Sequence, residues 1–497
     1  MNLLKKDLER NNERKVMFGI CFIFIIAMLI GSAYTSPLYP TNYGYDSAIF
    51  MLIGKAMVNG KTVYVDMFDH KGPILYFIEA LGYYLGGRTG IWILQCIFGL
   101  VTIFFTYATW KLIYNKQQGL RMNDWLVVLV SGYSIFFYTF ASGNLSEEYS
   151  LPFIAGCIYG FVKYVIRIEK EIKHSWIYAV FYGASIAILV LIRMNNAVAV
   201  CAGVLVIAVY LIYKKEYKNL LYNILGGMLG CSLILVPVII YFLSKNALDD
   251  MIYATFLYNF KYASEIGHQA LTEDIVIYGM LYFPIVVSVC LMLSKLIQSH
   301  RRREKVAFID VLIITMQCCS IISLLMMNVY GHYFTIYIPV YMLVLSRCFV
   351  FEKKKMLNLV VLSCTCLYTA IAFYFLGVSV YYNLISDTAR EKASIIYSDT
   401  QRIPEEERDS IIGYDIYSAY YLQGDILPCY KYYTLQDWWS ISNPDIKVEF
   451  LEWLKEENPL WLLVRPTIKD EDMIQILQTR YELKIMNDYL HYYRLVE

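Results

Sequence analysis

The stretch YDSAIFMLIGKAMVNGKTVYVDMFDHKGPILYF, residues 45–77, says more about the fold than any other part of the chain. It directly follows the first hydrophobic segment, which places it at a membrane surface. Its ionisable residues stand among aromatic ones: Asp46, Asp66, Asp69, His70 and Lys71. At the depth of the lipid headgroups, an acid and a base can meet a lipid phosphate. The stretch therefore predicts a catalytic loop.

Composition places the chain among integral membrane proteins. Apolar residues make up 58% of the 497 residues, and the mean hydropathy of +0.46 is well above that of a soluble domain. The run 16–34 follows a polar tail without a small-residue cleavage site, so we expect an uncleaved anchor. Each further apolar run has about the length that a helix needs to cross the hydrocarbon core. We expect about eleven spanning helices, at 16–34, 90–112, 124–141, 151–168, 176–192, 196–213, 220–244, 274–297, 306–328, 334–350 and 356–379.

The basic residues indicate the orientation of these spans, because Lys and Arg gather in cytoplasmic loops. The N-terminal tail and alternate connections are basic, whereas the connections 143–150 and 329–333 have no Lys or Arg. All basic loops reach one side only if the run 74–87, which contains Glu79 and ends in Gly-Gly, does not cross. We therefore expect 74–87 to be a juxtamembrane or re-entrant helix on the outer face, with the N-terminus cytoplasmic.

The segments between the expected spans are also unequal in length, and the long ones are expected on the outer side of the membrane. This indicates that the outer face carries the function. We expect a cytoplasmic tail at 1–15, a transmembrane catalytic domain at 16–379 with an outer loop at 35–88, and an extracytoplasmic domain at 380–497. Within this last segment the periodicity predicts strands near 410–416, 459–465, 481–486 and 490–496, and helices near 444–456 and 468–480. The segment is thus expected to be a small α/β domain.

The middles of the spans carry almost no ionisable residues, which argues against an ion-coupled transporter. The ionisable groups gather instead at the expected outer ends of helices, where Asp46, Lys71, Glu147, Arg193 and His332 lie. Chemistry at the outer interface fits this pattern better than transport through the centre. A flippase of lipid-linked sugars and a non-catalytic membrane scaffold or sensor are the alternatives.

Several short motifs resemble those of a known family. GYDSAIF, followed by FDHKGPILYF, resembles the first outer loop of the GT-C glycosyltransferases, in particular the branch of protein O-mannosyltransferases and lipid A aminoarabinose transferases with its family-39-like bacterial members. In that family an acid follows the first span, and a Lys-Pro-Pro-like segment opens a helix. Asp46 and Lys71-Gly72-Pro73 occupy these positions here. NLSEEYSLPF resembles the second acidic site, with Glu147 or Glu148 as its acid, and RMNNAV and GHYFTIYIP resemble motifs at the outer ends of later helices.

The resemblance implies a GT-C-like polytopic α-helical fold and an inverting glycosyltransferase. Its donor would be a polyprenyl-phosphate-linked sugar and its acceptor an envelope glycan, lipid or protein, at the outer face of the plasma (inner) membrane, with membrane lipids as surroundings and no nucleic-acid partner. Asp46 would be the general base. Lys71 and Arg193 would bind the donor phosphate, and His332 is a further candidate for phosphate or acceptor. Asp69 and His70 would orient Lys71.

Each of these residues also has an ordinary structural explanation. Asp46 could cap the next helix, Lys71 could extend to the headgroups, and Arg193 could be an interfacial anchor. Glu147 and Glu148 could sit in the first turn of the 151–168 helix, where the dipole favours acids. The sequence identifies no definite cofactor. A divalent metal held by Asp46, a glutamate and a histidine is an open alternative, although the spacing has no ligand signature. Tail aromatics are expected to contact an acceptor glycan: Tyr430, Tyr432, Tyr433, Trp438 and Trp439.

Overall fold

The structure is a computed structural model of the whole chain. It describes residues 19, 22–23, 26–114, 122–140, 142–167, 173–260, 275–326, 330–349, 356–436, 439 and 443–496. The prediction for the tail 1–15 and much of the first expected span lie outside these residues, although 26–32 are helical. Trp438 also lies outside them.

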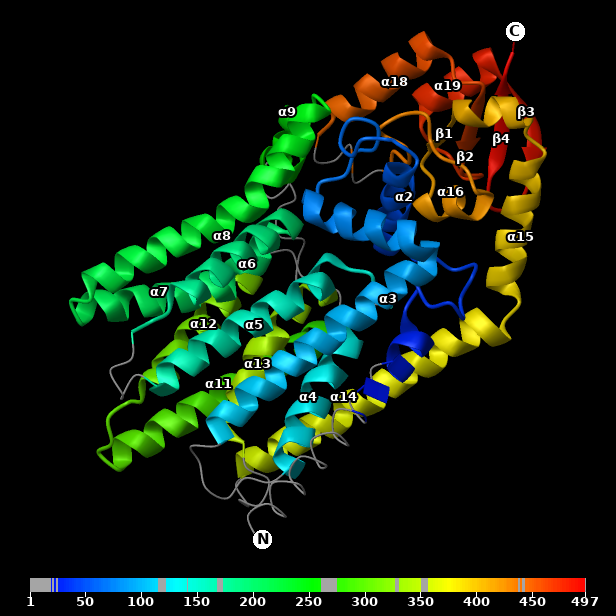
Figure 1. Cartoon of the computed structure of the whole chain (residues 1–497). Coiled ribbons are helices and arrows are strands. Elements are labelled where there is room, and N and C mark those ends of the chain that lie inside the picture. The colour runs from blue at the N-terminus through cyan, green and yellow to red at the C-terminus, as the bar shows by residue number, and fades with distance from the viewer. Residues whose placement is uncertain are drawn as a thin grey trace.

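Long apolar helices pack side by side into one bundle, which fills the lower left of Figure 1. Among the described residues, seven helices are long and apolar enough to cross a membrane, and two shorter apolar helices accompany them. Lipid favours this architecture because a helix satisfies its backbone polar groups internally. The helices of the bundle are α3 (Pro73–Tyr114), α4 (Met122–Thr139), α5 (Ser146–Arg167), α6 (Trp176–Ile192), α7 (Val198–Tyr213), α8 (Tyr217–Ser244), α11 (Ile275–Arg301), α12 (Phe308–Leu325), α13 (Ile338–Cys348) and α14 (Met356–Val380).

Each later span expected from hydropathy coincides with one of these helices, so the predicted fold class of a polytopic α-helical membrane protein is confirmed. The boundaries differ from the prediction by a few residues, and two of the differences concern the predicted site. The run 334–350 begins as a 3₁₀ helix, Gly331–Tyr337, before α13. The 151–168 helix begins earlier, at Ser146, so that both neighbouring glutamates lie within its first turn.

The helix α3 bends sharply at Gly86-Gly87, as the expected break after 74–87 requires. Gly87 has a φ of 58°, in the left-handed region that glycine tolerates. The backbones of Gly82 and Gly90 consequently come into contact, because a Cβ on Gly90 would lie 2.0 Å from the carbonyl oxygen of Gly82. The first half of α3 therefore runs across the end of the bundle, and the second half runs along it (Figure 1).

Glycines let α6 and α8 pack backbone to backbone. A Cβ on Gly183 would lie 2.0 Å from the carbonyl oxygen of Gly227, and one on Gly230 would lie 2.0 Å from that of Val180. Small residues bring helices together in membranes, where lipid tails remove most of the hydrophobic driving force. The surface of α8 that α6 does not cover exposes long apolar side chains, as a lipid-facing surface does: Leu221, Leu225, Leu229, Leu233 and Ile240.

The C-terminal part is a small α/β unit beyond one end of the bundle (Figure 1). Its four-stranded sheet has the order β1-β2-β4-β3, with β1 and β2 parallel and the other pairs antiparallel. The Asp470 side chain caps α19 by accepting a hydrogen bond from the Met473 amide at 3.1 Å. The elements are α15 (Thr388–Gln401), β1 (Ile411–Tyr414), α16 (Ser418–Gly424), α18 (Asp445–Glu457), β2 (Trp461–Val464), α19 (Glu471–Arg480), β3 (Tyr481–Met486) and β4 (His491–Leu495). These bounds confirm the predicted strands and helices, while α15 and α16 were not predicted.

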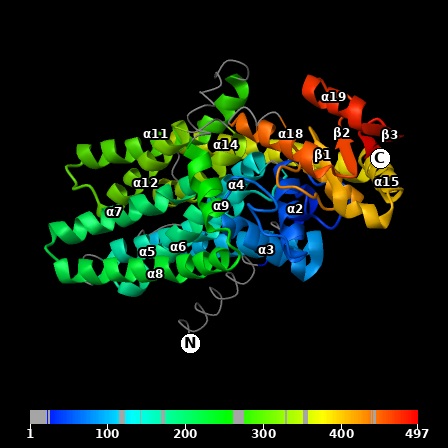
Figure 2. The same cartoon turned by 90° about the horizontal axis from the view of Figure 1, so that it is seen from above.

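The stretch 45–77 lies between the bundle and this unit, and both views show it there (Figures 1 and 2). It is not wholly a loop, because α2 (Asp46–Val58) forms its first part. Its buried apolar residues share one core with the C-terminal sheet, and the bundle has a second core of its own. The remaining short elements join these parts: η2 (Met194–Ala197), α9 (Leu248–Ile252), η3 (Tyr253–Leu257), η4 (Gly331–Tyr337), η5 (Tyr381–Ile385) and η6 (Glu405–Ser410).

We predict that Gly230→Ala destabilises the protein by about 1–3 kcal/mol, because the added methyl group forces α6 and α8 apart. Gly279→Ala is the matched control, since its Cβ would meet no atom within 4 Å. The thermal midpoint of the purified protein in detergent is the measurement. Equal midpoints for the two variants would contradict the close packing of the helices.

Candidate active site at the end of the helix bundle

Asp46 is the first residue of α2 and is partly exposed. The cap position of this helix is Tyr45, and no side chain caps its first amides. The alternative that Asp46 caps the next helix is therefore wrong. Because the helix dipole favours a negative charge in the first turn, the position suits an ionised carboxylate that remains available to a ligand.

The segment Lys71-Gly72-Pro73 packs directly on the end of α6. The Gly72 amide donates a hydrogen bond to the Ile192 carbonyl at 3.0 Å. A Cβ on Gly72 would lie only 2.1 Å from the carbonyl oxygen of Leu191, so the contact requires glycine. Pro73 then opens α3, where a proline costs no hydrogen bond. This contact sets Lys71 beside Arg193, the residue that follows α6.

A chain of polar contacts leads from Asp69 through His70 to Lys71. The Lys71 Nζ atom lies 3.0 Å from His70 Nε2, and His70 Nδ1 lies 3.2 Å from an Asp69 carboxylate oxygen. The other Asp69 oxygen accepts a hydrogen bond from the Tyr76 hydroxyl. Because the Lys71 ammonium has only protons to donate, His70 Nε2 accepts from it, and the His70 proton resides on Nδ1.

The electrostatics support this assignment of protons. Burial raises the pKa of Asp69. The hydrogen bond with His70, the positive charge that His70 carries once protonated in acid, and the charge of Lys71 outweigh this effect and lower the pKa of Asp69 to about 2. Burial, followed by the charge of Lys71, lowers the pKa of His70 below its ordinary value. At neutral pH, Asp69 is therefore ionised and His70 is neutral, as the tautomer above requires.

Aromatic packing anchors this segment to the C-terminal unit. The Phe68 amide donates to the Lys431 carbonyl at 3.0 Å, and the Phe68 ring lies 5.3–5.8 Å from the rings of Tyr258, Tyr432 and Trp439. Tyr432, Tyr433 and Trp439 are buried. The expectation that these three contact an acceptor glycan is therefore wrong, because their rings are already used in the core.

Glu147 and Arg193 form a buried ion pair between α5 and the end of α6. The Glu147 side chain is 1% exposed and that of Arg193 is 16% exposed. The Ser146 hydroxyl donates to the second carboxylate oxygen of Glu147 at 2.9 Å. The Arg193 guanidinium also stacks on the Tyr333 ring at 3.5 Å from its centroid. An ion pair that is buried from water needs such additional contacts to offset its loss of hydration.

The charged groups that act on His332 relate the other predicted residues to this ion pair. Burial lowers its pKa, the negative charges of Glu147 and Asp46 oppose this effect, and the positive charges of Arg193 and Lys71 add to it. All four charged groups thus act on one imidazole. Asp46, Lys71, Glu147 and Arg193 thus lie within electrostatic range of His332, although the five residues come from four separate parts of the chain.

Glu148 points into a different network from Glu147. One of its carboxylate oxygens accepts from the Gln95 amide at 2.7 Å and from the Asn144 backbone at 3.1 Å. The Asn144 side chain in turn lies 3.4 Å from buried Glu79, and the Tyr149 hydroxyl bonds both residues. Sequence reasoning missed these partners and Tyr333. The polar cluster Asn-Leu-Ser-Glu-Glu-Tyr was a visible signal for them, but its contacts with α3 were not.

Within the residues that the structure describes, no group of three His, Cys, Asp or Glu side chains could hold a metal ion. The open alternative of a divalent metal at Asp46, a glutamate and a histidine thus finds no such group there.

Two solved structures of ArnT from Cupriavidus metallidurans share the architecture of the chain. One is bound to undecaprenyl phosphate and has a TM-score of 0.63 and 11% sequence identity, with 96% of this chain and 98% of that chain covered. The other, in the apo state, has a TM-score of 0.60 and 10% identity, with 98% of each chain covered. The protein is therefore a multi-pass membrane protein with a GT-C-like fold.

A family model described as "Putative competence-induced protein Ccs4 N-terminal domain" matches residues 6–360. The chain belongs to this family. The match covers the stretch 45–77 and the bundle from α3 to α13, whereas most of α14 and the C-terminal sheet lie beyond it. A comparison with curated proteins gave no match.

We predict that Glu147→Gln lowers the free energy of unfolding by about 3–5 kcal/mol, because the Arg193 charge stays buried without its partner. Glu482→Gln is the matched control, since Glu482 and its partner Lys484 are exposed and an exposed pair contributes little. Thermal unfolding in detergent measures both. The double variant Glu147→Gln/Arg193→Gln should regain part of the loss, and no regain would contradict a direct charge pairing.

Proposed function

We propose that the protein is an inverting glycosyltransferase that moves a sugar from a polyprenyl-phosphate donor to an envelope acceptor. The observation that carries the proposal is the cluster of Lys71, Arg193, His332 and Asp46 at one end of a GT-C-like bundle. The similar ArnT structure that contains undecaprenyl phosphate supports a polyprenyl-phosphate lipid as the ligand. We place this end on the outer face of the plasma membrane and the N-terminus in the cytoplasm, in keeping with the distribution of Lys and Arg.

The donor phosphate binds between Lys71 and Arg193. The leaving polyprenyl phosphate is an anion, and fixed positive charges in a poorly hydrated site stabilise it as it forms. Lys71 approaches as a point charge, while the planar Arg193 guanidinium offers several donors. Glu147 and Tyr333 hold Arg193 in place, so Glu147 acts on the phosphate through Arg193. Glu148 has its carboxylate engaged by Gln95 and the Asn144 backbone, which favours a supporting role over direct catalysis.

Asp46 is the general base of the transfer. The acceptor hydroxyl oxygen attacks the anomeric carbon, and its proton passes to the Asp46 carboxylate. The bond between that carbon and the phosphate oxygen breaks, and the polyprenyl phosphate leaves with the bonding electrons. A single displacement of this kind inverts the anomeric carbon. Asp69 and His70 keep the Lys71 ammonium in position while the negative charge develops.

We predict that Lys71→Met weakens binding of undecaprenyl phosphate about 10- to 100-fold, because the variant loses one hydrogen bond between charged groups. Titration of the lipid followed by native mass spectrometry gives the affinity. Lys469→Met, at an exposed position of the C-terminal unit, is the control and should bind as wild type does. Unchanged affinity in Lys71→Met would remove Lys71 from the phosphate site.

We predict that Asp46→Asn lowers transfer about 10²- to 10⁴-fold, while binding of undecaprenyl phosphate persists. The assay uses membranes with equal amounts of each variant and a panel of radiolabelled undecaprenyl-phosphate sugars. It follows release of the lipid phosphate and transfer of label to envelope fractions. Asp488→Asn, an exposed acid of the C-terminal unit, is the control. Transfer by Asp46→Asn at the wild-type rate would contradict its role as the base.

A further inference from the structure

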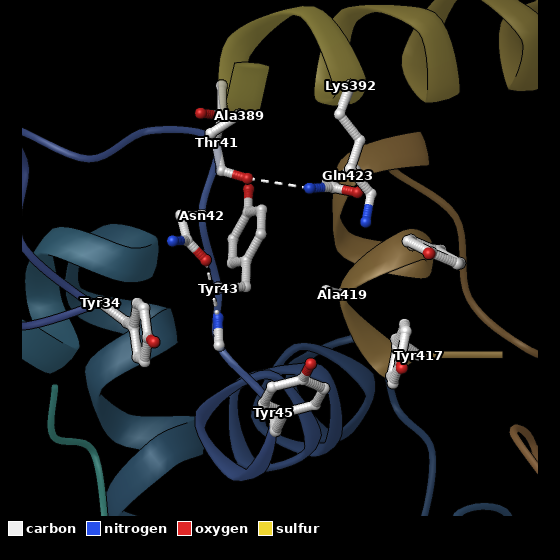
Figure 3. Close-up of a pocket in the computed structure, with 12 residues that line it drawn as sticks. Tyr34, Thr41, Asn42, Tyr43, Tyr45, Ala389, Lys392, Tyr417, Ala419 and Gln423 are labelled. Atoms are coloured by element: carbon white, nitrogen blue, oxygen red, sulfur yellow. Dashed lines mark hydrogen bonds between the residues drawn. The ribbon is translucent and has the colours of Figure 1, made fainter. Parts of the chain in front are cut away.

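A cavity of about 300 Å³ lies between the segment 34–45 and the helices α15 and α16. We call it the tyrosine cavity, because the rings of Tyr34, Tyr43, Tyr45, Tyr417 and Tyr420 line it. Figure 3 shows Tyr45 and Tyr417 on one side and Asn42 and Gln423 on the other. Its volume is within the range of small-molecule sites.

A second cavity of about 370 Å³ shares Tyr43 and Gln423 with the first. We call it the Lys55 cavity, because the ion pair between Lys55 and Asp425, with a separation of 2.6 Å, lines it. Since two side chains belong to both cavities, the two form neighbouring chambers on either side of Tyr43 and Gln423. Both chambers lie between the stretch that holds Asp46 and the C-terminal unit.

Two buried polar atoms along these chambers have no hydrogen-bond partner in the part of the chain that the structure describes. The Gln423 side-chain nitrogen donates to the Thr41 carbonyl at 2.9 Å, but its oxygen accepts nothing. One terminal nitrogen of Arg88 is likewise without an acceptor, although the guanidinium contacts the Tyr34 carbonyl and stacks over the Tyr43 ring. Buried polar groups normally have a hydrogen-bond partner. A ligand with hydroxyl groups would supply one to the Gln423 oxygen and one to the Arg88 nitrogen.

The combination of aromatic rings with side-chain hydrogen-bond donors and acceptors indicates the class of ligand. A sugar ring has an apolar face of C–H groups that packs on aromatic rings and an edge of hydroxyls that both donate and accept. The Gln423 oxygen needs a donor and the Arg88 nitrogen needs an acceptor, and hydroxyls supply both. A lipid chain would leave these atoms unsatisfied. The Lys55 and Asp425 charges neutralise each other. The Lys392 ammonium, which also lines the tyrosine cavity, lies over the Tyr420 and Tyr489 rings, 4.8 and 5.0 Å from their centroids.

We propose that the tyrosine cavity and the Lys55 cavity together bind a saccharide. This proposal rests on the proposed function, because the saccharide is taken to be part of the acceptor. Tyr45 lines the tyrosine cavity and directly precedes Asp46, so a sugar chain held there continues toward the base. The Tyr45 ring makes an edge-to-face contact with the Tyr417 ring at 5.1 Å, so the wall of the chamber joins the segment 34–45 to the C-terminal unit. The acceptor is accordingly a glycan, and the C-terminal unit supplies half of its binding site.

The test is saturation-transfer-difference NMR on the full chain in lipid nanodiscs, without any donor. The probes are maltotriose, chitotriose and a rhamnose trisaccharide, each of which presents different hydroxyls. We expect ring-proton signals from at least one probe with wild type, reduced at least five-fold in Tyr417→Ala and in Gln423→Leu. The matched controls are Tyr382→Ala and Gln475→Leu, at exposed positions outside both cavities, and they should retain the full signal.

The outcomes separate this proposal from the proposed function. No signal from any probe, or equal signals in wild type and both cavity variants, overturns saccharide binding even if Asp46→Asn abolishes transfer. A signal that the cavity variants lose and Asp46→Asn retains supports it, whether or not transfer is detected. Thermal midpoints of Tyr417→Ala and Gln423→Leu, and their affinity for undecaprenyl phosphate, show that they are folded. Tyr417→Phe keeps the ring and should restore the signal, which a role of the hydroxyl alone would not allow.

Discussion

The ion pair between Glu147 and Arg193 is the interaction on which the candidate site depends. Neither charge can remain in so dry a place without the other, because burial of a single charge costs several kcal/mol. The pair therefore joins the start of α5 to the end of α6 and, through the Tyr333 ring, to the segment before α13. The close contact of Gly72 with Leu191 then sets Lys71 against this joint. One electrostatic requirement thus assembles the positive charges for an anionic phosphate.

The C-terminal unit has a larger part in the site than its distance along the chain suggests. Its buried residues and those of the stretch 45–77 form one core. Phe68 packs among rings from the segment that precedes α18 and from Tyr258, which follows η3. The Lys55–Asp425 pair and the contact of Gln423 with Thr41 add polar links. The unit consequently supports Lys71 on one side and encloses two cavities beside Asp46 on the other.

Local patterns were reliable where the physical cause is local. Apolar runs of spanning length became helices, the Gly-Gly pair after 74–87 became a sharp bend, and alternation in the tail became β1 to β4. Errors arose where a contact from far along the chain decides. Tyr432 and Trp439 are residue types that are also typical of sugar-binding surfaces, yet the Phe68 ring packs against both of them. Glu147 and Glu148 are adjacent in sequence, but Arg193 engages one and Gln95 the other.

The sequence by itself determined the membrane class, the helical spans, the α/β unit and the identity of the candidate residues, because hydrophobicity, periodicity and side-chain chemistry are properties of short segments. Only the tertiary structure decided which of those residues meet. The order of Asp69, His70 and Lys71, the pairing of Glu147 with Arg193 and the proximity of both to His332 depend on how α3, α5 and α6 converge. Such contacts join residues that are far apart in sequence. Each segment alone would allow other contacts, but close backbone packing and the burial of charge favour the ones that the structure has.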